Sequence, residues 1–129
     1  MFQINQRSGQ PLYEQLLANI EEAIMNQVFL KDEQLPSVRA LAQDLAINPN
    51  TIQKTYGILE ERGIIYSRPG RGSFVAVSAE ELGAKRTPNM YKQLDHCLES
   101  LFQLRIQEED IVAHIHDFFT KMGERGEAQ

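Results

Sequence analysis

The sequence predicts a mainly α fold that contains one small β-hairpin. Apolar residues recur at spacings of three and four along most of the 129 residues, and this is the period of an amphipathic helix. Between Ile64 and Val77 the pattern changes to two short β-branched and aromatic runs around Arg68-Pro69-Gly70-Arg71-Gly72, which is typical of a hairpin. A composition of 42% apolar and 24% charged residues lies in the globular range.

The first predicted helix runs from Pro11 to Asn26. Pro11 suits the first helical position, where its missing N–H is not needed. The apolar positions of this helix are Leu12, Leu16, Ile20, Ala23 and Ile24. A polar turn at residues 31–34 separates it from Pro36.

Two further helices are joined by a turn at Ala46-Ile47. Ser37 is a suitable N-cap for the first of them, whose apolar residues are Val38, Leu41, Ala42 and Leu45. Asn48-Pro49 supplies an N-cap and a first-position proline for the second, which extends to about Arg62. We expect that helix to bury Ile52, Leu59 and either Thr55 or Tyr56, and to end at Gly63 with positive φ. Three helices followed by a hairpin predict a winged helix-turn-helix domain over residues 1–77.

Residues 78–129 predict a small α-helical dimerisation region. We expect a short helix from Ser78, a bend between Gly83 and Asn89, a helix from Met90 to about Leu104, and a last helix from Glu108. These helices carry more apolar surface than they can bury on each other, so we expect them to pair with a second chain. The residues expected in that interface are Leu94, Leu98, Leu101, Ile111, Ile115, Phe118 and Phe119.

The charge is unevenly distributed. The formal net charge of −5 taken alone argues against nucleic acid as a partner. Residues 1–77, however, hold 7 basic and 8 acidic side chains, whereas residues 78–129 hold 6 and 10. The net charge therefore does not exclude DNA binding by the first part, although it predicts weak non-specific affinity.

Four segments carry a family resemblance. They are Leu35-Pro36-Ser37-Val38-Arg39-Ala40-Leu41-Ala42, residues 48–54, residues 59–63 and residues 70–75. In this order and spacing they resemble the GntR family of bacterial transcription regulators, and the short C-terminal part resembles the YtrA subfamily. The resemblance implies a homodimeric repressor of an inverted-repeat operator, often in an ABC-transporter operon. Gln27, Asp32 and Ala46 stand where the family usually has glycine.

Polar residues at the start of the third predicted helix suit the major groove of DNA. Asn48, Asn50 and Gln53 can bond adenine edges, Thr51 a phosphate or a thymine methyl, and Lys54 a phosphate. By resemblance, Arg39 contacts DNA and the hairpin tip enters the minor groove. The tip residues are Arg68, Gly70, Arg71 and Gly72. The alternatives are that these cations are ordinary surface residues, that Asn48 is only an N-cap, and that the tip is only a turn.

No group of residues predicts an enzyme, a cofactor or a metal site. The single Cys97 forms no intramolecular disulfide or zinc cluster and is expected in a core. His114 and His116 lie two apart, so they point to different sides of a helix. Without a signal-peptide or membrane-spanning run, we expect a cytoplasmic protein whose partners are double-stranded operator DNA and a second copy of itself.

Two alternatives stay open. The first is a winged helix used as a protein-interaction module. The second is a ligand-sensing regulator with a small pocket in the dimer core, although we expect the last 50 or so residues to be too few for a pocket of about 300 Å³. The sequence does not indicate the operator, the regulated genes or an effector.

Overall fold

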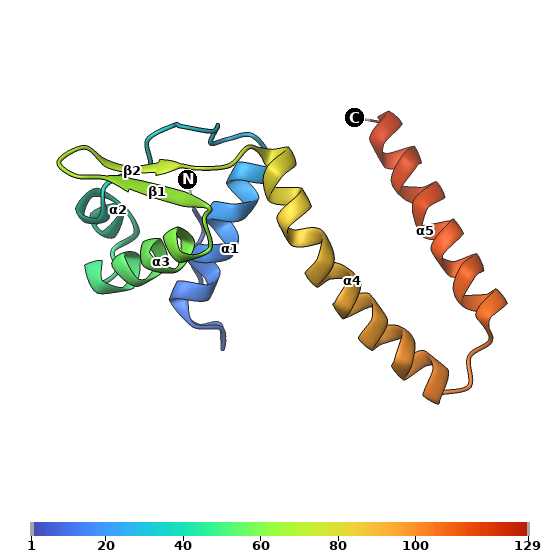
Figure 1. Ribbon diagram of the computed structural model, residues 1–129. Helices are drawn as coiled ribbons and strands as arrows, with labels where there is room; N and C mark the ends of the chain where they lie inside the picture. Colours follow the sequence, from blue (N-terminus) through green and yellow to red (C-terminus); the bar gives the residue numbers. More distant parts are fainter. Residues whose placement is uncertain (1, 129) are drawn as a thin grey trace. The chain divides into compact units, whose positions relative to one another are not determined.

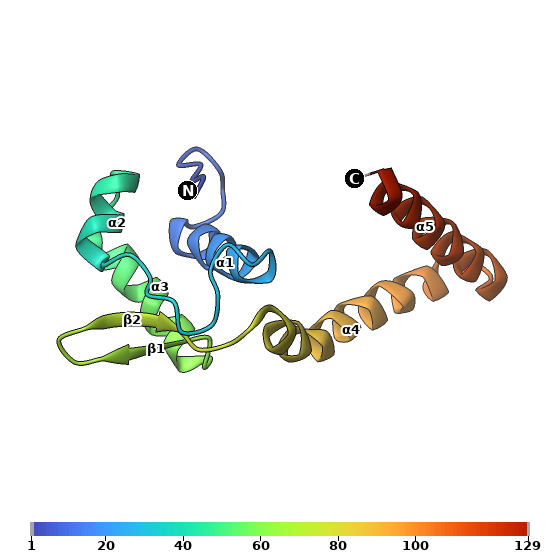
Figure 2. The same cartoon turned by 90° about the horizontal axis from the view of Figure 1, so that it is seen from above.

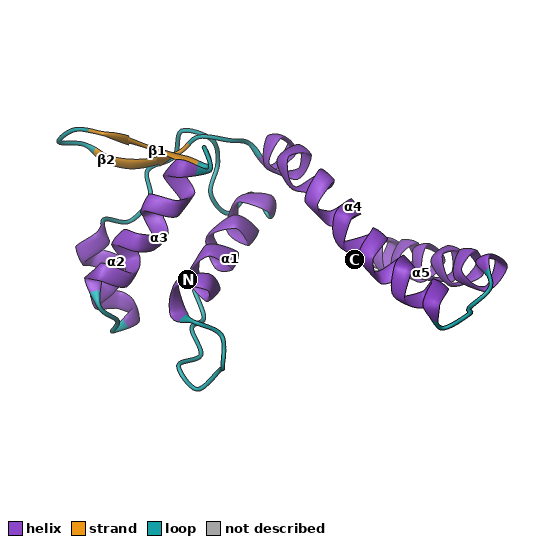
Figure 3. Cartoon of the chain, turned by 60° about the horizontal axis from the view of Figure 1, so that its bottom comes forward, coloured by secondary structure: helices purple, strands orange, loops and turns teal. Residues whose placement is uncertain are grey.

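The computed structural model describes residues 2–128, and in that range it contains five α-helices and one pair of β-strands (Figure 1). The helices are α1 (Leu12–Met25), α2 (Val38–Leu45), α3 (Pro49–Glu61), α4 (Ala79–Gln103) and α5 (Glu108–Ala128). The strands are β1 (Ile65–Arg68) and β2 (Gly72–Val75). Figure 3 shows that helices dominate both parts of the chain, which confirms the predicted fold class.

The chain forms two compact units, Met1–Thr87 and Pro88–Gln129. The boundary between them lies inside α4, whereas the predicted domain boundary lies between residues 77 and 78, just before that helix. Met1, where the first predicted range begins, and Gln129, where the second ends, lie outside the described residues. The assignment of one range to DNA binding and the other to dimerisation stays a prediction.

Helix α1 begins one residue later than predicted. Pro11 has ψ of 147° and is therefore the N-cap rather than the first helical residue. The apolar stripe packs inward, with Leu16, Ile20 and Ile24 fully buried. Burial of such a stripe is the main stabilising contribution of a short helix.

Helices α2 and α3 begin at the two predicted caps. The Ser37 hydroxyl accepts a hydrogen bond from the Ala40 N–H at 3.1 Å, and Asn48 Oδ1 accepts one from the Asn50 N–H at 2.9 Å. Helix α3 buries both Thr55 and Tyr56, whereas the sequence left the choice between them open. The Tyr56 hydroxyl donates to the Pro36 carbonyl at 2.7 Å, and burial raises the pKa of Tyr56 to about 12.

Four of the described residues other than glycine have left-handed backbone: Gln27, Asp32, Ala46 and Arg105. The φ values are 61° at Gln27, 69° at Asp32 and 55° at Ala46, and these three are the positions where the family resemblance predicts glycine. Gly63, which ends α3, has φ of 75° as expected. The backbone thus follows the family pattern although the side chains depart from it.

The hairpin is extended by a third segment. Strands β1 and β2 are antiparallel, with Ile65 opposite Val75 and Tyr66 opposite Phe74. Residues 32–35, which the sequence predicts only as a turn and its exit, pair with the other edge of β2. The Leu35 N–H donates to Ser73 O at 2.9 Å, and the Val75 N–H donates to Glu33 O at 2.9 Å. We call residues 32–35 the strap and residues 65–75 the wing.

The first unit has one continuous core. Figure 2 shows α1 and α3 next to each other, with the turn of the hairpin extending beyond the helices. Leu82, in the first turn of α4, also belongs to this core and is 1% exposed. The other buried apolar residues are Leu16, Leu17, Ile20, Ala23, Ile24, Phe29, Leu35, Leu41, Ala42, Ile47, Ile52, Tyr56, Leu59, Ile64, Ile65, Val75 and Val77.

The predicted bend between Gly83 and Asn89 is wrong, because α4 is continuous over 25 residues with Pro88 inside it. A proline inside a helix removes one backbone hydrogen bond and costs about 3 kcal/mol. The first turn of α4 is well supported, since Ser78 and Glu81 form a reciprocal capping box: the Glu81 N–H donates to Ser78 Oγ at 3.1 Å and the Ser78 N–H donates to Glu81 Oε1 at 3.4 Å. The loss at Pro88 is therefore too local to end the helix.

The second unit consists of the rest of α4 and of α5. The acidic residues Glu108, Glu109 and Asp110 occupy the first turn of α5, as predicted. Cys97 is exposed, so its prediction as a core residue is wrong for the single chain. The reason is that no described residue of the chain covers this side of α4.

Candidate nucleic-acid interface

The predicted major-groove residues lie together in the first two turns of α3. Asn48, Asn50, Gln53 and Lys54 are exposed, and Thr51 is half-buried. The opposite side of α3 is fixed in the core by Ile52 and Leu59, which are 0% exposed. The buried side therefore leaves the polar side of α3 facing outward.

The side chain of Asn48 already accepts a hydrogen bond within the chain, whereas that of Arg39 forms no ion pair among the described residues. One oxygen of Asn48 caps α3, so the N-cap role is confirmed, and a base contact by its free amide nitrogen stays a prediction. Arg39 is exposed near the start of α2 and takes part in no ion pair within the described residues. Its guanidinium is available for a phosphate or a base.

The wing carries two exposed cations and two glycines that its turn requires. Gly70 has φ of 73° and Gly72 has φ of 118°, a region in which side chains other than glycine are strained. The Arg71 N–H donates to Arg68 O at 2.9 Å and closes the turn. Arg68 and Arg71 are both exposed at this tip.

The strap holds the wing tip in place. Gln34 Nε2 donates to the Arg71 carbonyl at 2.6 Å, and a Cβ on Gly72 would lie 2.8 Å from Gln34 Nε2. No local sequence pattern predicts this role of Gln34, because the contact joins residues 37 apart. The position of Gln34 on the strap, opposite Phe74, explains the contact.

A second contact joins the strap to β1. The Tyr66 hydroxyl donates to Asp32 Oδ1 at 2.9 Å, and this hydrogen bond raises the pKa of Tyr66. The Tyr66 ring stacks on Phe74 with 5.4 Å between centroids, and the Arg68 guanidinium lies 5.4 Å from the Tyr66 ring centroid. Tyr66 thus supports one of the two cations of the wing.

Lys31, the residue just before the strap, contacts α4. Lys31 Nζ lies 2.9 Å from Glu81 Oε1. The hydrogen bond between them raises the pKa of Lys31 and lowers that of Glu81. Both side chains are about half exposed, so salt and water screen this pair.

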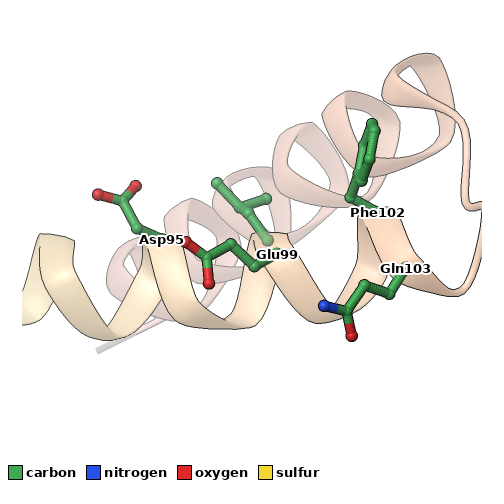
Figure 4. A pocket seen from close by; sticks show the side chains of 5 residues that line it. Asp95, Glu99, Phe102 and Gln103 are labelled. Carbon is green, nitrogen blue, oxygen red and sulfur yellow. The ribbon is translucent and has the colours of Figure 1, made fainter.

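The second unit exposes apolar side chains. Phe102 is 81%, Phe119 69% and Phe118 54% exposed. Of the other predicted interface residues, Leu94 and Ile115 are exposed and Leu98, Leu101 and Ile111 are half-buried. Figure 4 shows Asp95, Glu99 and Gln103 following one another along α4 with Phe102 nearby. These residues and Leu98 line a hollow of about 540 Å³.

A larger hollow of about 930 Å³ lies at the turn between α4 and α5. Leu98, Phe102, Ile106, Ile111 and Ile115 supply much of its apolar lining. This hollow lies on the surface of a single chain, so the expectation that the region is too short for a pocket of about 300 Å³ in the dimer core stays a prediction.

Among the described residues no helix is long and apolar enough to span a membrane. In the same range, no three His, Cys, Asp or Glu side chains gather as metal ligands would.

Comparison with known proteins identifies the family. Residues 12–75 match the family described as bacterial regulatory proteins, gntR family. Over 93 residues the chain is 37% identical to the HTH-type transcriptional repressor YtrA of Bacillus subtilis (strain 168), covering 72% of each protein. The chain belongs to the GntR family.

Solved structures agree with this membership. A transcriptional regulator from Oenococcus oeni is 28% identical and superposes with a TM-score of 0.77 over 90% of this chain and 97% of that one. The AraR DNA-binding domain in complex with operator ORX1 is 29% identical, with a TM-score of 0.54 over 58% of this chain and 96% of that one. The GntR protein described here is accordingly a YtrA-like, winged-helix DNA-binding transcription regulator and not an enzyme.

Proposed function

We propose that this GntR protein is a homodimeric repressor that binds an inverted-repeat operator. Each protomer would place α3 in a major groove and its wing in the adjacent minor groove. The observation that supports this best is the exposed polar start of α3, together with a wing whose tip is hydrogen-bonded to Gln34 of the strap. Rigid, exposed recognition elements bind DNA without having to be ordered first.

The proposed roles follow from side-chain chemistry. Asn50, Gln53 and the free amide of Asn48 read base edges, and Thr51 bonds a phosphate or a thymine methyl. Arg39 and Lys54 neutralise phosphates. At the tip, Arg68 and Arg71 supply charge to the minor groove, and Gly70 and Gly72 permit close approach of the backbone.

The exposed apolar residues of α4 and α5 support the homodimer. A monomeric protein rarely leaves rings as exposed as Phe102, Phe118 and Phe119 in one small unit. In a two-fold dimer the same residues of both chains cover each other. Two-fold symmetry of the protein would match an inverted repeat in the DNA.

The YtrA-like resemblance suggests the target and the compartment. We propose that the regulated operon encodes an ABC transporter and that the protein acts in the cytoplasm. Selection of bound fragments from the source genome, followed by sequencing, gives the half-site spacing and the neighbouring genes together. Enrichment of fragments without a repeated half-site would contradict the dimeric operator.

Arginine variants test the DNA footprint. Arg39→Ala and Arg71→Ala should each weaken operator binding, and the salt dependence should fall by about one ion per lost phosphate contact. Arg125→Ala, which removes the same charge from the end of α5, is the matched control and should bind as the wild type does. If wild type shows no salt-sensitive DNA binding, the protein-interaction alternative replaces this proposal.

A charge placed in the interface tests the dimer. Phe118→Glu should shift the sedimentation coefficient from dimer to monomer, because a carboxylate cannot be buried unpaired. Thr120→Glu adds the same charge two residues away, on another side of α5, and should stay dimeric. A monomeric wild type at micromolar concentration would contradict the proposal.

A second candidate function is ligand sensing at the hollow of about 930 Å³ at the α4–α5 turn, and because its lining includes the expected interface residues Leu98, Ile111 and Ile115, the partner chain would form part of the pocket. Its size and apolar lining suit a small organic molecule. A thermal-shift screen of apolar cations and metabolites tests this. A hit whose stabilisation disappears in Val112→Asp, a residue of the hollow outside the expected dimer interface, and which also lowers operator affinity, would support it.

A further inference from the structure

A hollow on the proposed DNA face lies between α1 and the start of α3. It has a volume of about 410 Å³ and is lined by Leu12, Tyr13, Asn50, Thr51 and Lys54. Three of these residues belong to the proposed recognition helix and two to α1. The first helix of the chain thus contributes to the surface that would meet DNA.

The cation of this hollow is held by an aromatic ring. Lys54 Nζ lies 3.9 Å from the centroid of the Tyr13 ring, which is within the range of a cation–π interaction. The Tyr13 hydroxyl, at the ring edge, donates to Glu14 Oε1 at 3.3 Å. The edge of the ring is therefore occupied by Glu14, and the face is occupied by Lys54.

A lysine on a DNA face normally loses side-chain freedom when it binds a phosphate. Lys54 is exposed, yet its ammonium already occupies one position over the Tyr13 ring. A cation–π contact leaves the N–H groups that point away from the ring free to donate. The ring therefore fixes the ammonium without neutralising its charge, whereas a carboxylate would neutralise it.

The proposed function requires phosphate contacts from Lys54, and on that basis we propose a more specific role for the hollow. It receives a backbone phosphate of the operator, bonded by the Lys54 ammonium and the Thr51 hydroxyl. Tyr13 is a positioning residue that holds Lys54 in the required place. Through Tyr13, the start of α1 takes part in DNA binding without itself contacting a base.

Four proteins test this proposal: Tyr13→Leu, Tyr13→Phe, Lys54→Ala, and the double variant of Tyr13→Leu with Lys54→Ala. The probe is a labelled duplex carrying the best site selected from a random pool, titrated between about 50 and about 200 mM salt. One phosphate contact contributes about 0.9 to the logarithmic salt slope. Raising the salt fourfold should weaken binding by the wild type more than binding by Lys54→Ala. The two losses of affinity should differ by a factor of about 3.5 for each protomer.

Tyr13→Leu should lower affinity at low salt by about 2- to 5-fold, the size of an exposed cation–π contact, and move the slope toward that of Lys54→Ala. Tyr13→Phe keeps the ring face and should restore the wild-type values. In the Lys54→Ala background, Tyr13→Leu should have no further effect. An additive effect in the double variant, or an unchanged slope in Tyr13→Leu, would overturn the proposal.

A measurement on the wild type keeps the test valid if Tyr13→Leu does not fold. Ring currents should shift the Lys54 Hε resonances upfield in the free protein, and an unshifted signal would refute the pairing. The two proposals fail in different ways. If wild type binds and Arg71→Ala weakens binding while Tyr13→Leu does not, only the role of Tyr13 is wrong.

Discussion

The left-handed turn between α2 and α3 leads to a prediction about stability. Ala46 has φ of 55°, and its side chain is exposed. The backbone bonds of the turn, Ala46 N–H to Gln43 O at 3.3 Å and Ile47 N–H to Ala42 O at 3.1 Å, use no side chain. Replacement by glycine therefore removes no packing and no hydrogen bond.

The magnitude follows from two opposing terms. Left-handed backbone costs a residue other than glycine about 1–2 kcal/mol, and Ala46→Gly removes this cost. Glycine also makes the unfolded chain more flexible, which opposes folding by about 0.4–1 kcal/mol. The free energy of unfolding should rise by about 0.5–1 kcal/mol, so the Tm of the first unit should rise by about 2–8 °C.

Urea denaturation followed by circular dichroism measures this change. Ala18→Gly is the matched control: it makes the same chemical change at an exposed position inside α1, where glycine should destabilise by about 0.8–1 kcal/mol. The two variants should thus differ in sign with an unchanged m value. A destabilised Ala46→Gly variant would refute the reasoning that the turn is strained.

Two further predictions concern the wing and the Lys31–Glu81 ion pair. Gly72→Ala, at φ of 118°, should introduce local strain of about 1–3 kcal/mol and speed hydrogen exchange of the Arg71 amide. Slower exchange of that amide would contradict this. The control is Gly57→Ala, in open space on α3, which should stabilise that helix by about 0.5–1 kcal/mol. Because the Glu81 pKa is lowered from 4.5 and the Lys31 pKa is raised from 10.5, the pair stabilises the fold between these values. Its contribution should be lost as pH falls through the folded pKa of Glu81 or rises through that of Lys31. The difference in stability between wild type and Glu81→Gln, measured by denaturation across pH, should shrink at both ends, and a pH-independent difference would count against the pair.

Local chemistry accounts for what the sequence predicted well. The caps at Ser37 and Asn48 and the end of α3 at Gly63 depend on residues only a few positions away, so the sequence carries the whole signal. The same applies to the hairpin, whose strands and turn are contiguous. The predicted interface residues at the start of α3 were brought together for the same reason.

Contacts between distant segments account for the rest. Gln34 reaches the Arg71 carbonyl, and Lys54 lies over Tyr13, because helix and strand packing brings these residues together. No local pattern marks either contact. The bend predicted before Pro88 was wrong because the rule for proline in helices describes one lost bond and does not weigh the turns on either side.

Because α4 is uninterrupted, the number of residues between two of its apolar positions sets the sides of the helix on which they lie. Leu82 lies in the core of the first unit, and Leu94 and Leu98 lie further along the same helix. Each residue added or removed between Leu82 and Leu94 turns the later positions by about 100° around the helix axis relative to Leu82. A heptad insertion leaves them displaced by only about 20°. A single-residue insertion in this stretch therefore changes the side of α4 on which the later apolar residues lie, even though it replaces no buried side chain.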